Sequence, residues 1–221
     1  MIEKSVVKSS KTGSRKISKQ NLGILGLKSS NAVALNSVLQ NLEYSTNIVM
    51  KANQIRSLSH LIIPGIGFIK SITDEISAET LLSEEIKNFS MSGKPVLGIC
   101  LGMHLLGMAS EEEPSAKCLK VLNYNTVDMQ RIIKSQVLPH IGWNQVYFED
   151  ENDIFKSIPN YSDFYFSHSF GVLESINKIA LTKYETNFIS AVRKDNVFGV
   201  QFHPERSQSV GIQLLHNFLN I

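Results

Sequence analysis

The sequence predicts an α/β protein with an open, mostly parallel sheet flanked by helices, and three observations support this prediction. Apolar, β-branched segments alternate with segments of helical periodicity over residues 21–109. These candidate strands are apolar on both faces, which is typical of strands buried in a parallel sheet. Residues 119–148 and 163–202 contain short alternating runs instead, which favour antiparallel strands added in the C-terminal half.

The first half of the chain supplies the predicted parallel core. Strands are expected at Asn21–Leu27, Asn47–Met50, His60–Ile63 and Pro95–Ile99, and Pro64–Gly65 should end the third of them. Helical spacing of apolar residues predicts helices over Ser30–Leu42, Glu75–Ser92 and Leu101–Ala109. Ser29 or Ser30 is the expected N-cap of the first helix, and Gly93 and Pro95 should close the second.

The second half adds shorter elements. Antiparallel strands appended to the sheet are predicted from the runs at Phe164–Ser167, Ala180–Tyr184 and Phe198–Phe202. An amphipathic helix over Ser209–Leu219 should close the fold. Because no internal repeat or linker interrupts the chain, we expect one domain over residues 21–221.

The composition is that of an ordinary globular protein. Of the 221 residues, 43% are hydrophobic and 19% are charged, which excludes a collagen-like, low-complexity or wholly disordered chain. The net charge of +2 is unevenly distributed, because residues 1–20 hold six basic residues and one acidic residue, a net +5, and the rest carries −3. Since the basic character lies in this tail, we predict no nucleic-acid-binding domain.

The N-terminal tail is rich in Lys and Ser and has no apolar periodicity, which predicts a disordered basic extension over residues 1–20. It lacks the apolar core of a secretory signal. Its basic, Ser-rich and acid-poor composition is also typical of an organellar transit peptide, and this alternative stays open.

The two cysteines, Cys100 and Cys118, are too few for a disulfide framework and, without several histidines, too few for a structural zinc site. We therefore expect a reduced, cytoplasmic protein. The apolar stretches at Leu61–Ile69 and Val96–Ala109 are interrupted by Pro, Gly or His. Both are shorter than the ~18–20 residues of a membrane-spanning helix, so no membrane association is predicted.

The sharpest local pattern is GICLG at residues 98–102, where an apolar strand runs directly into a helix. It matches the G-x-nucleophile-x-G elbow, with Cys100 in place of the usual serine. The glycines allow a tight turn, and the helix N-terminus favours the thiolate over the thiol. Cys100 is therefore the candidate nucleophile, and the alternative is a buried cysteine packed between glycines. Cys118 has no such setting and is interpreted as structural or incidental.

A thiolate nucleophile needs a base, and the base needs an orienting group. Both are present in the segment His203-Pro-Glu205, which follows the predicted end of an apolar strand. Two residues along an extended segment place both side chains on one side, so Glu205 can hold one ring nitrogen while the other faces sulfur. The alternative is an ordinary surface His-Pro turn.

Acyl chemistry also needs donors directed at a developing oxyanion. The turn Pro64–Gly67 follows a predicted strand and should lie at the same carboxyl edge of the sheet as Cys100. Its glycines would let backbone N–H groups face a substrate. A dinucleotide site is not predicted, because no G-x-G-x-x-G opens a helix after the first strand.

Three segments, PGIGFI at 64–69, GICLGMHLL at 98–106 and VQFHPERS at 200–207, have the order and spacing of the class I, triad-type glutamine amidotransferases. The chain resembles this family over residues 21–221. The segments LPHIGWN at 138–144, FYFSHSF at 164–170 and SAVRKDNVFGVQFHPERS at 190–207 are similar, more narrowly, to the glutaminase subunits of imidazole glycerol phosphate synthase.

This resemblance implies a role for each matching residue. Cys100 would attack the carboxamide carbon of glutamine, and His203, oriented by Glu205, would act as the base. Residues that would stabilise the oxyanion or line the glutamine pocket are Gly65, Ile66, Gly67, Leu101, His104, His168 and Ser169. Residues that would lie at a subunit interface near the ammonia exit are Pro139, His140, Gly142, Trp143 and Asn144.

The resemblance also implies a partner chain. Ammonia would pass to a (β/α)₈-barrel cyclase subunit in a heterodimer, which joins it to a ribulosyl-aminoimidazole nucleotide in histidine biosynthesis. No metal or organic cofactor is implied.

Three features depart from the family pattern. His104 stands where a substrate-binding glutamine is usual, and it could donate a hydrogen bond, perturb the thiolate or simply pack in its helix. Leu27–Ser30 replaces a glycine-rich turn, although Asn31 remains, and the basic tail has no counterpart. Two alternatives therefore stay open: a paralogous glutaminase that supplies ammonia for amidation of a surface-polysaccharide sugar, and a non-catalytic assembly subunit, which a broken triad would indicate.

Overall fold

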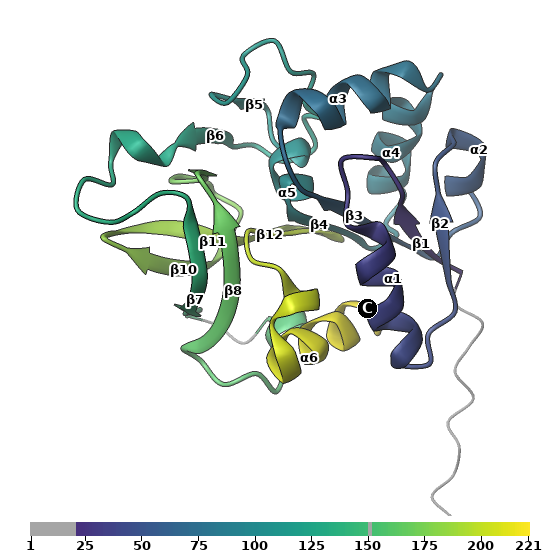
Figure 1. Ribbon diagram of the computed structural model, residues 1–221. Helices are drawn as coiled ribbons and strands as arrows, with labels where there is room; N and C mark the ends of the chain where they lie inside the picture. Colours follow the sequence, from purple (N-terminus) through teal and green to yellow (C-terminus); the bar gives the residue numbers. More distant parts are fainter. Residues whose placement is uncertain (1–20, 150–151) are drawn as a thin grey trace, which may run out of the picture.

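The computed structural model describes residues 21–149 and 152–221, and its central feature is a seven-stranded sheet. The strand order is β10-β11-β12-β4-β3-β1-β2 (Figure 1). The strands from β12 to β2 run parallel to their neighbours, whereas the β10–β11 and β11–β12 pairs are antiparallel. The predicted class, an open and mostly parallel α/β sheet with added antiparallel strands, is confirmed. The predicted disorder of residues 1–20 lies outside the described residues.

The strands of this sheet are short and mostly apolar. They are β1 (Leu22–Leu25), β2 (Thr46–Val49), β3 (His60–Gly65), β4 (Val96–Cys100), β10 (Lys178–Tyr184), β11 (Thr186–Lys194) and β12 (Val197–Val200). The four central strands β1, β3, β4 and β12 are buried along their whole length. This burial agrees with strands that are covered on both faces.

Helices cover both faces of the sheet. One face carries α1 (Ala32–Asn41) and α6 (Gln208–Phe218), and the other carries α3 (Ile69–Ala78), α4 (Leu82–Met91) and α5 (Leu101–Leu106), as Figure 1 shows. A short helix, α2 (Ala52–Ile55), packs with the second group. Alternate strand residues divide between two apolar cores. Ile62 and Leu97 pack with α1 and α6, whereas Ile63 and Val96 pack with α3–α5.

Two smaller sheets lie beside the main one. Strands β7 (His140–Val146) and β8 (Ser162–His168) form an antiparallel pair, and β5 (Ala109–Ser110), β6 (Asn125–Asp128) and β9 (Phe170–Gly171) form a three-stranded sheet. Short 3₁₀ helices are η1 (Met129–Arg131), η2 (Asp153–Phe155) and η3 (Pro204–Arg206). The predicted strand Phe164–Ser167 is thus part of β8, but its position in the main sheet was wrong, because β8 pairs with β7 instead.

The single helix predicted over Glu75–Ser92 is two helices, α3 and α4, and the first of them begins earlier than predicted, at Ile69. Leu81, between them, has a left-handed backbone with φ 65°. The apolar stripe of α3 ends at Ile76, and that of α4 begins at Leu82. Residues six positions apart, such as Ile76 and Leu82, do not lie on the same face of one helix. The helix must therefore be interrupted between them if both apolar stripes are to be buried.

Three predicted element boundaries were also wrong. Strand β3 continues through Pro64 to Gly65, because its pairing with β1 ends at Ile62 and the proline lies beyond it. Helix α1 begins at Ala32 after Asn31, so neither Ser29 nor Ser30 is its N-cap. Helix α5 ends at Leu106, since the chain turns there to pair with the segment around Tyr124.

Strand β12 lies in the parallel part of the sheet, although the run Phe198–Phe202 predicted an appended antiparallel strand. It pairs parallel with β4 and antiparallel with β11. This position matters for the site, because the carboxyl ends of β4 and β12 meet at the same edge of the sheet. No helix in the described parts of the chain combines the length and apolarity needed to cross a bilayer.

Candidate active site

Cys100 lies at a strained turn between β4 and α5. Its backbone has φ 52° and ψ −109°, a conformation that side-chain-bearing residues rarely adopt. The turn depends on glycine, because a Cβ atom on Gly102 would lie 1.8 Å from the carbonyl oxygen of Ile63. The geometry is therefore that of the nucleophile elbow predicted from GICLG. Cys100 is 6% exposed and is a free thiol, as is the buried Cys118.

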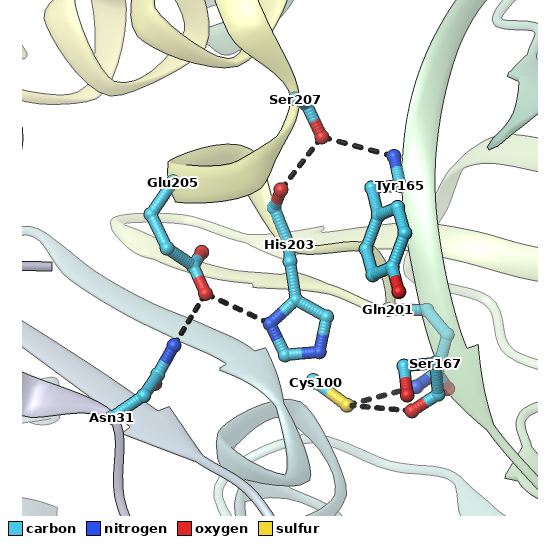
Figure 2. Close-up of polar contacts among 8 residues, drawn as sticks. All are labelled: Asn31, Cys100, Tyr165, Ser167, Gln201, His203, Glu205 and Ser207. Carbon is cyan, nitrogen blue, oxygen red and sulfur yellow. Dashed lines mark hydrogen bonds and ion pairs between the residues drawn. The ribbon is translucent and has the colours of Figure 1, made fainter. Parts of the chain in front are cut away.

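His203 and Glu205 follow β12 at the edge where Cys100 lies. The β4–β12 register pairs Ile99 with Val200, so Cys100 at the end of β4 lies next to the segment that follows β12. His203 Nδ1 lies 2.8 Å from Glu205 Oε1, and both side chains are almost fully buried. Figure 2 shows the imidazole between the Glu205 carboxylate and the Cys100 sulfur. The expected extended segment is a 3₁₀ turn instead, and this turn also places the carboxylate against the ring.

Asn31 holds the carboxylate from the other side. Its Nδ2 donates a hydrogen bond of 2.5 Å to Glu205 Oε1 (Figure 2). The side chain therefore makes no cap hydrogen bond to α1, although Asn31 is the N-cap residue. Asn31 is part of the family pattern, but its position in the sequence does not indicate a role. Only the fold brings it to Glu205, which is 174 positions away in the chain.

The backbone at His203 is anchored to strand β8. The His203 N–H donates to the Tyr165 carbonyl oxygen at 2.8 Å. Ser207 Oγ donates to the His203 carbonyl oxygen at 2.6 Å and accepts from the Tyr165 N–H at 3.0 Å (Figure 2). These bonds fix the turn that carries the imidazole.

The charges at the site favour a protonated His203. Burial lowers the pKa of His203, but the Cys100 thiolate and the Glu205 carboxylate raise it, with a net increase to about 10. An imidazolium beside a thiolate is the state that lets a cysteine act as nucleophile and a histidine then act as acid.

The sulfur has two further polar neighbours that the sequence analysis missed. Cys100 Sγ lies 3.9 Å from the Ser167 carbonyl oxygen and 3.8 Å from Gln201 Nε2 (Figure 2). Gln201 could have been found, because it precedes His203 by two residues and alternate strand positions share a face. Ser167 comes from β8 and has no local signal.

A cavity of about 480 Å³ opens beside Cys100. Of the residues predicted to bind substrate or stabilise an oxyanion, those in its lining are Ile66, Gly67, Leu101, His104, His168 and Ser169. Gly65 is not in the lining and serves close packing instead, since a Cβ atom there would lie 2.8 Å from Leu101 Cβ. Leu101 is the first residue of α5, where a backbone N–H has no partner within the helix.

The predicted oxyanion loop is tied to the loop after β1. The Ile66 N–H donates to the Ser29 carbonyl oxygen at 3.1 Å, so in this conformation it is not available to a substrate. Ser29 is in turn held by Glu75 of α3, whose Oε1 accepts from both the Ser29 N–H and the Ser29 hydroxyl. The loop Leu27–Ser30 is thus anchored by the Glu75 side chain.

The cavity wall also contains an acidic residue that the sequence analysis missed. Glu112 lies on the lining, and its Oε2 accepts from the Ile69 N–H at 3.2 Å. Burial raises the pKa of Glu112, partly offset by that hydrogen bond. A partly buried carboxylate in a cavity beside a nucleophile can bind an ammonium group.

The segment predicted to lie at an interface divides between buried and exposed residues. Pro139 lines the cavity, whereas His140 is buried and its Nδ1 lies 3.0 Å from His168 Nε2. Burial lowers the pKa of His140 to about 4. Asn144 Nδ2 lies 3.3 Å from His140 Nε2, so the three side chains form a row from β7 to the cavity. Gly142 has φ 135°, and the neighbouring Trp143 is 47% exposed.

The chain matches a known class of enzyme, the glutamine amidotransferases. The family model for class-I glutamine amidotransferases matches residues 25–221. Two solved structures share the fold: a glutamine amidotransferase (TM-score 0.71, 18% identity, 90% of this chain and 97% of that one) and PurLQS from Thermotoga maritima (TM-score 0.71, 19% identity, 92% and 99%). The chain belongs to this class of enzyme.

Within the class, the sequence is similar to curated proteins named imidazole glycerol phosphate synthase subunit HisH. The protein from Buchnera aphidicola is 39% identical over 86% of this chain and 94% of its own length. The protein from Salmonella typhimurium is 37% identical over 91% of this chain and 100% of its own length, and that from Pelagibacter ubique is 36% identical over 76% and 83%. The chain therefore belongs to the HisH family.

Proposed function

We propose that this chain hydrolyses glutamine with a Cys100–His203–Glu205 triad and supplies the ammonia to a synthase partner. The observation that carries the proposal is the site geometry. A strained cysteine at a helix N-terminus lies beside a histidine that is held 2.8 Å from a buried carboxylate, at the edge of a cavity large enough for an amino acid.

The first half-reaction forms a thioester. The Cys100 thiolate attacks the side-chain carboxamide carbon of glutamine, and the carbonyl π electrons move to oxygen. As the tetrahedral intermediate collapses, the C–N bond breaks and protonated His203 gives its proton to the departing nitrogen. Ammonia leaves, and His203 is then neutral.

The second half-reaction returns the enzyme to its starting state. His203 takes a proton from water, and the oxygen of that water attacks the thioester carbon. Collapse breaks the C–S bond, and its electron pair returns to sulfur as the thiolate. Glu205, itself held by Asn31, keeps the imidazole oriented and stabilises its protonated form in both steps.

Oxyanion stabilisation needs backbone donors on the cavity side of Cys100. The Leu101 N–H at the start of α5 and the Gly67 N–H in the adjoining loop are the proposed donors. The Ile66 N–H is a less suitable donor while Ser29 accepts its hydrogen bond.

Recognition of the substrate is proposed to include Glu112. Glutamine carries an α-ammonium group, and the Glu112 carboxylate lies on the cavity lining with one hydrogen bond from the Ile69 N–H. An ion pair in a partly buried site would orient the amino acid with its carboxamide toward sulfur.

The partner is proposed to be a (β/α)₈-barrel cyclase subunit, as in imidazole glycerol phosphate synthase. Support comes from the HisH relatives and from strand β7, where Ile141 is 60% exposed and Trp143 is 47% exposed. These apolar side chains follow Pro139 of the cavity wall. An interface there would receive ammonia directly from the site. We also propose the cytoplasm as the compartment, where free thiols persist.

The test is co-purification with the candidate barrel subunit, followed by measurement of glutamate formation with and without the nucleotide ligand of the barrel. We expect negligible glutaminase activity from the isolated chain and strong stimulation in the liganded complex. A complex that forms no glutamate under either condition would refute the proposal. Rescue of a histidine auxotroph by the pair separates this function from sugar amidation.

A further inference from the structure

A buried glutamine lies between the candidate nucleophile and the histidine on α5. Gln201 is fully buried, with its Nε2 3.8 Å from Cys100 Sγ and its Oε1 2.8 Å from His104 Nε2. One amide therefore contacts both the reacting sulfur and a second buried polar side chain. The proposed mechanism described above does not use either contact.

The parallel pairing of β4 and β12 produces this arrangement. Ile99 pairs with Val200, so Cys100, the last residue of β4, lies next to Gln201, the first residue after β12. The Gln201 backbone is held by a hydrogen bond from its N–H to the Ser190 carbonyl oxygen, at 2.9 Å. His104 is one helical turn beyond Cys100 on α5 and meets the far side of the same amide.

The hydrogen-bond pattern determines which way the Gln201 amide faces. Burial lowers the pKa of His104 to about 4, partly offset by the bond to Gln201, so the ring is neutral at pH 7. When His104 Nε2 carries the proton, it donates to Gln201 Oε1, and the amide NH₂ then faces sulfur. His104 Nδ1 is left as an acceptor, and it has no partner among the described residues.

The flipped amide is less favourable on two counts. Its carbonyl oxygen would face the sulfur, where a thiolate repels it. Its NH₂ would require an unprotonated His104 Nε2, which leaves an N–H at Nδ1 buried without an acceptor. A buried donor without an acceptor is unfavourable, so the network favours the amide with its donor toward Cys100.

We propose that Gln201 donates a hydrogen bond to the Cys100 sulfur during glutamine hydrolysis, and that His104 is the positioning residue that fixes the direction of this donor. The proposal rests on the proposed glutaminase function. The sulfur is anionic before attack and again when the C–S bond of the thioester breaks. At both points the Gln201 N–H stabilises the electron pair on sulfur, opposite the imidazolium of His203.

The test compares Gln201→Met, which keeps most of the volume but removes the donor, with Gln201→Glu, which keeps the acceptor for His104 and places a carboxylate beside sulfur. The first readout is the rate of Cys100 alkylation by iodoacetamide in the full chain, with mass spectrometry to separate Cys100 from Cys118. The second is kcat and KM for glutamine in the complex with the barrel subunit. Circular dichroism checks the fold of each variant.

Loss of one hydrogen bond to a charged group predicts about a tenfold fall in alkylation rate and in kcat for Gln201→Met, with KM unchanged. Gln201→Glu should fall further, by about a hundredfold, although it is the closer match in shape. His104→Met should slow alkylation in the wild-type background but have no further effect in Gln201→Met, since its role is to orient that amide.

Wild-type alkylation rates in either folded Gln201 variant would overturn the proposal, as would additive effects of the His104 and Gln201 substitutions. If Gln201→Met does not fold, the alkylation rates of Gln201→Glu and His104→Met test the proposal instead, and wild-type rates in these variants would overturn it. A wild-type complex without glutaminase activity would refute the proposed function instead. The alkylation rates would still test the contact between Gln201 and sulfur.

Discussion

Replacing His104 with glutamine should change how stability depends on pH, because His104 is buried and neutral in the native state. Burial lowers its pKa from 6.5 to about 4. The unfolded chain therefore binds a proton at His104 below pH 6.5 that the native chain does not bind until about pH 4. His104 therefore lowers the free energy of unfolding of the wild type progressively as the pH falls from 6.5 to about 4. Below that pH both states bind the proton, and the free energy falls no further on account of His104.

The size of the effect follows from the two pKa values. Between pH 7.5 and pH 5, His104 should reduce the free energy of unfolding by about 2 kcal/mol. His104→Gln removes this contribution. Between pH 7.5 and pH 5, the free energy of unfolding of the variant should therefore rise by about 2 kcal/mol relative to that of the wild type. The other titrating groups are common to both chains and cancel in the difference, except His168, whose pKa is lowered by burial and also by its neighbours His140 and His104.

The assay is urea unfolding of both chains at pH 7.5, 6.5, 5.5 and 5, followed by circular dichroism. Leu105→Ala is the matched control, since it alters a buried side chain of the same helix without removing a titrating group. Its stability difference from wild type should not vary with pH. A difference between wild type and His104→Gln that also stays constant, within about 0.5 kcal/mol, would refute the neutral buried state of His104.

Three further substitutions test the elbow, the triad support and the substrate cavity. Gly102→Ala should destabilise the fold by about 3 kcal/mol or more, since its Cβ would lie 1.8 Å from the Ile63 carbonyl oxygen; a urea midpoint equal to wild type would contradict this. Asn31→Ala removes a hydrogen bond to the Glu205 carboxylate and should lower kcat about tenfold at unchanged KM, in steady-state assays of the complex. Glu112→Gln should raise KM for glutamine at least tenfold with a smaller change in kcat, and an unchanged KM would exclude Glu112 from binding the ammonium group.

The parts of the fold that the sequence predicted are those with a strong local pattern. The elbow at Cys100 could be predicted because its glycines and its strand-to-helix transition are contiguous in the chain. The buried central strands were found because apolar runs indicate two-sided burial. The break between α3 and α4 was missed because the sequence is helical on both sides of it. The only sign of a turn is that Ile76 and Leu82, which are both buried, would lie on different faces of one continuous helix.

The contacts that complete the candidate site depend on pairing between distant segments. The parallel placement of β12 beside β4 decides that Gln201 lies next to Cys100, and the alternating pattern of that strand does not specify its neighbour. Asn31 reaches Glu205 only because α1 and η3 lie at one edge of the sheet. The N–H of Ile66 was expected to face substrate, but its bond to Ser29 depends on the anchoring of that loop by Glu75.

Cys100 is proposed to perform only the glutamine-dependent step of the reaction. The most direct test is Cys100→Ala in the complex with the proposed barrel subunit, assayed in parallel with glutamine and with ammonium salt as the nitrogen source. We predict that glutamine hydrolysis and glutamine-dependent synthesis are abolished, while ammonia-dependent synthesis continues at the wild-type rate. Glutamine hydrolysis at the wild-type rate in this variant would contradict the account.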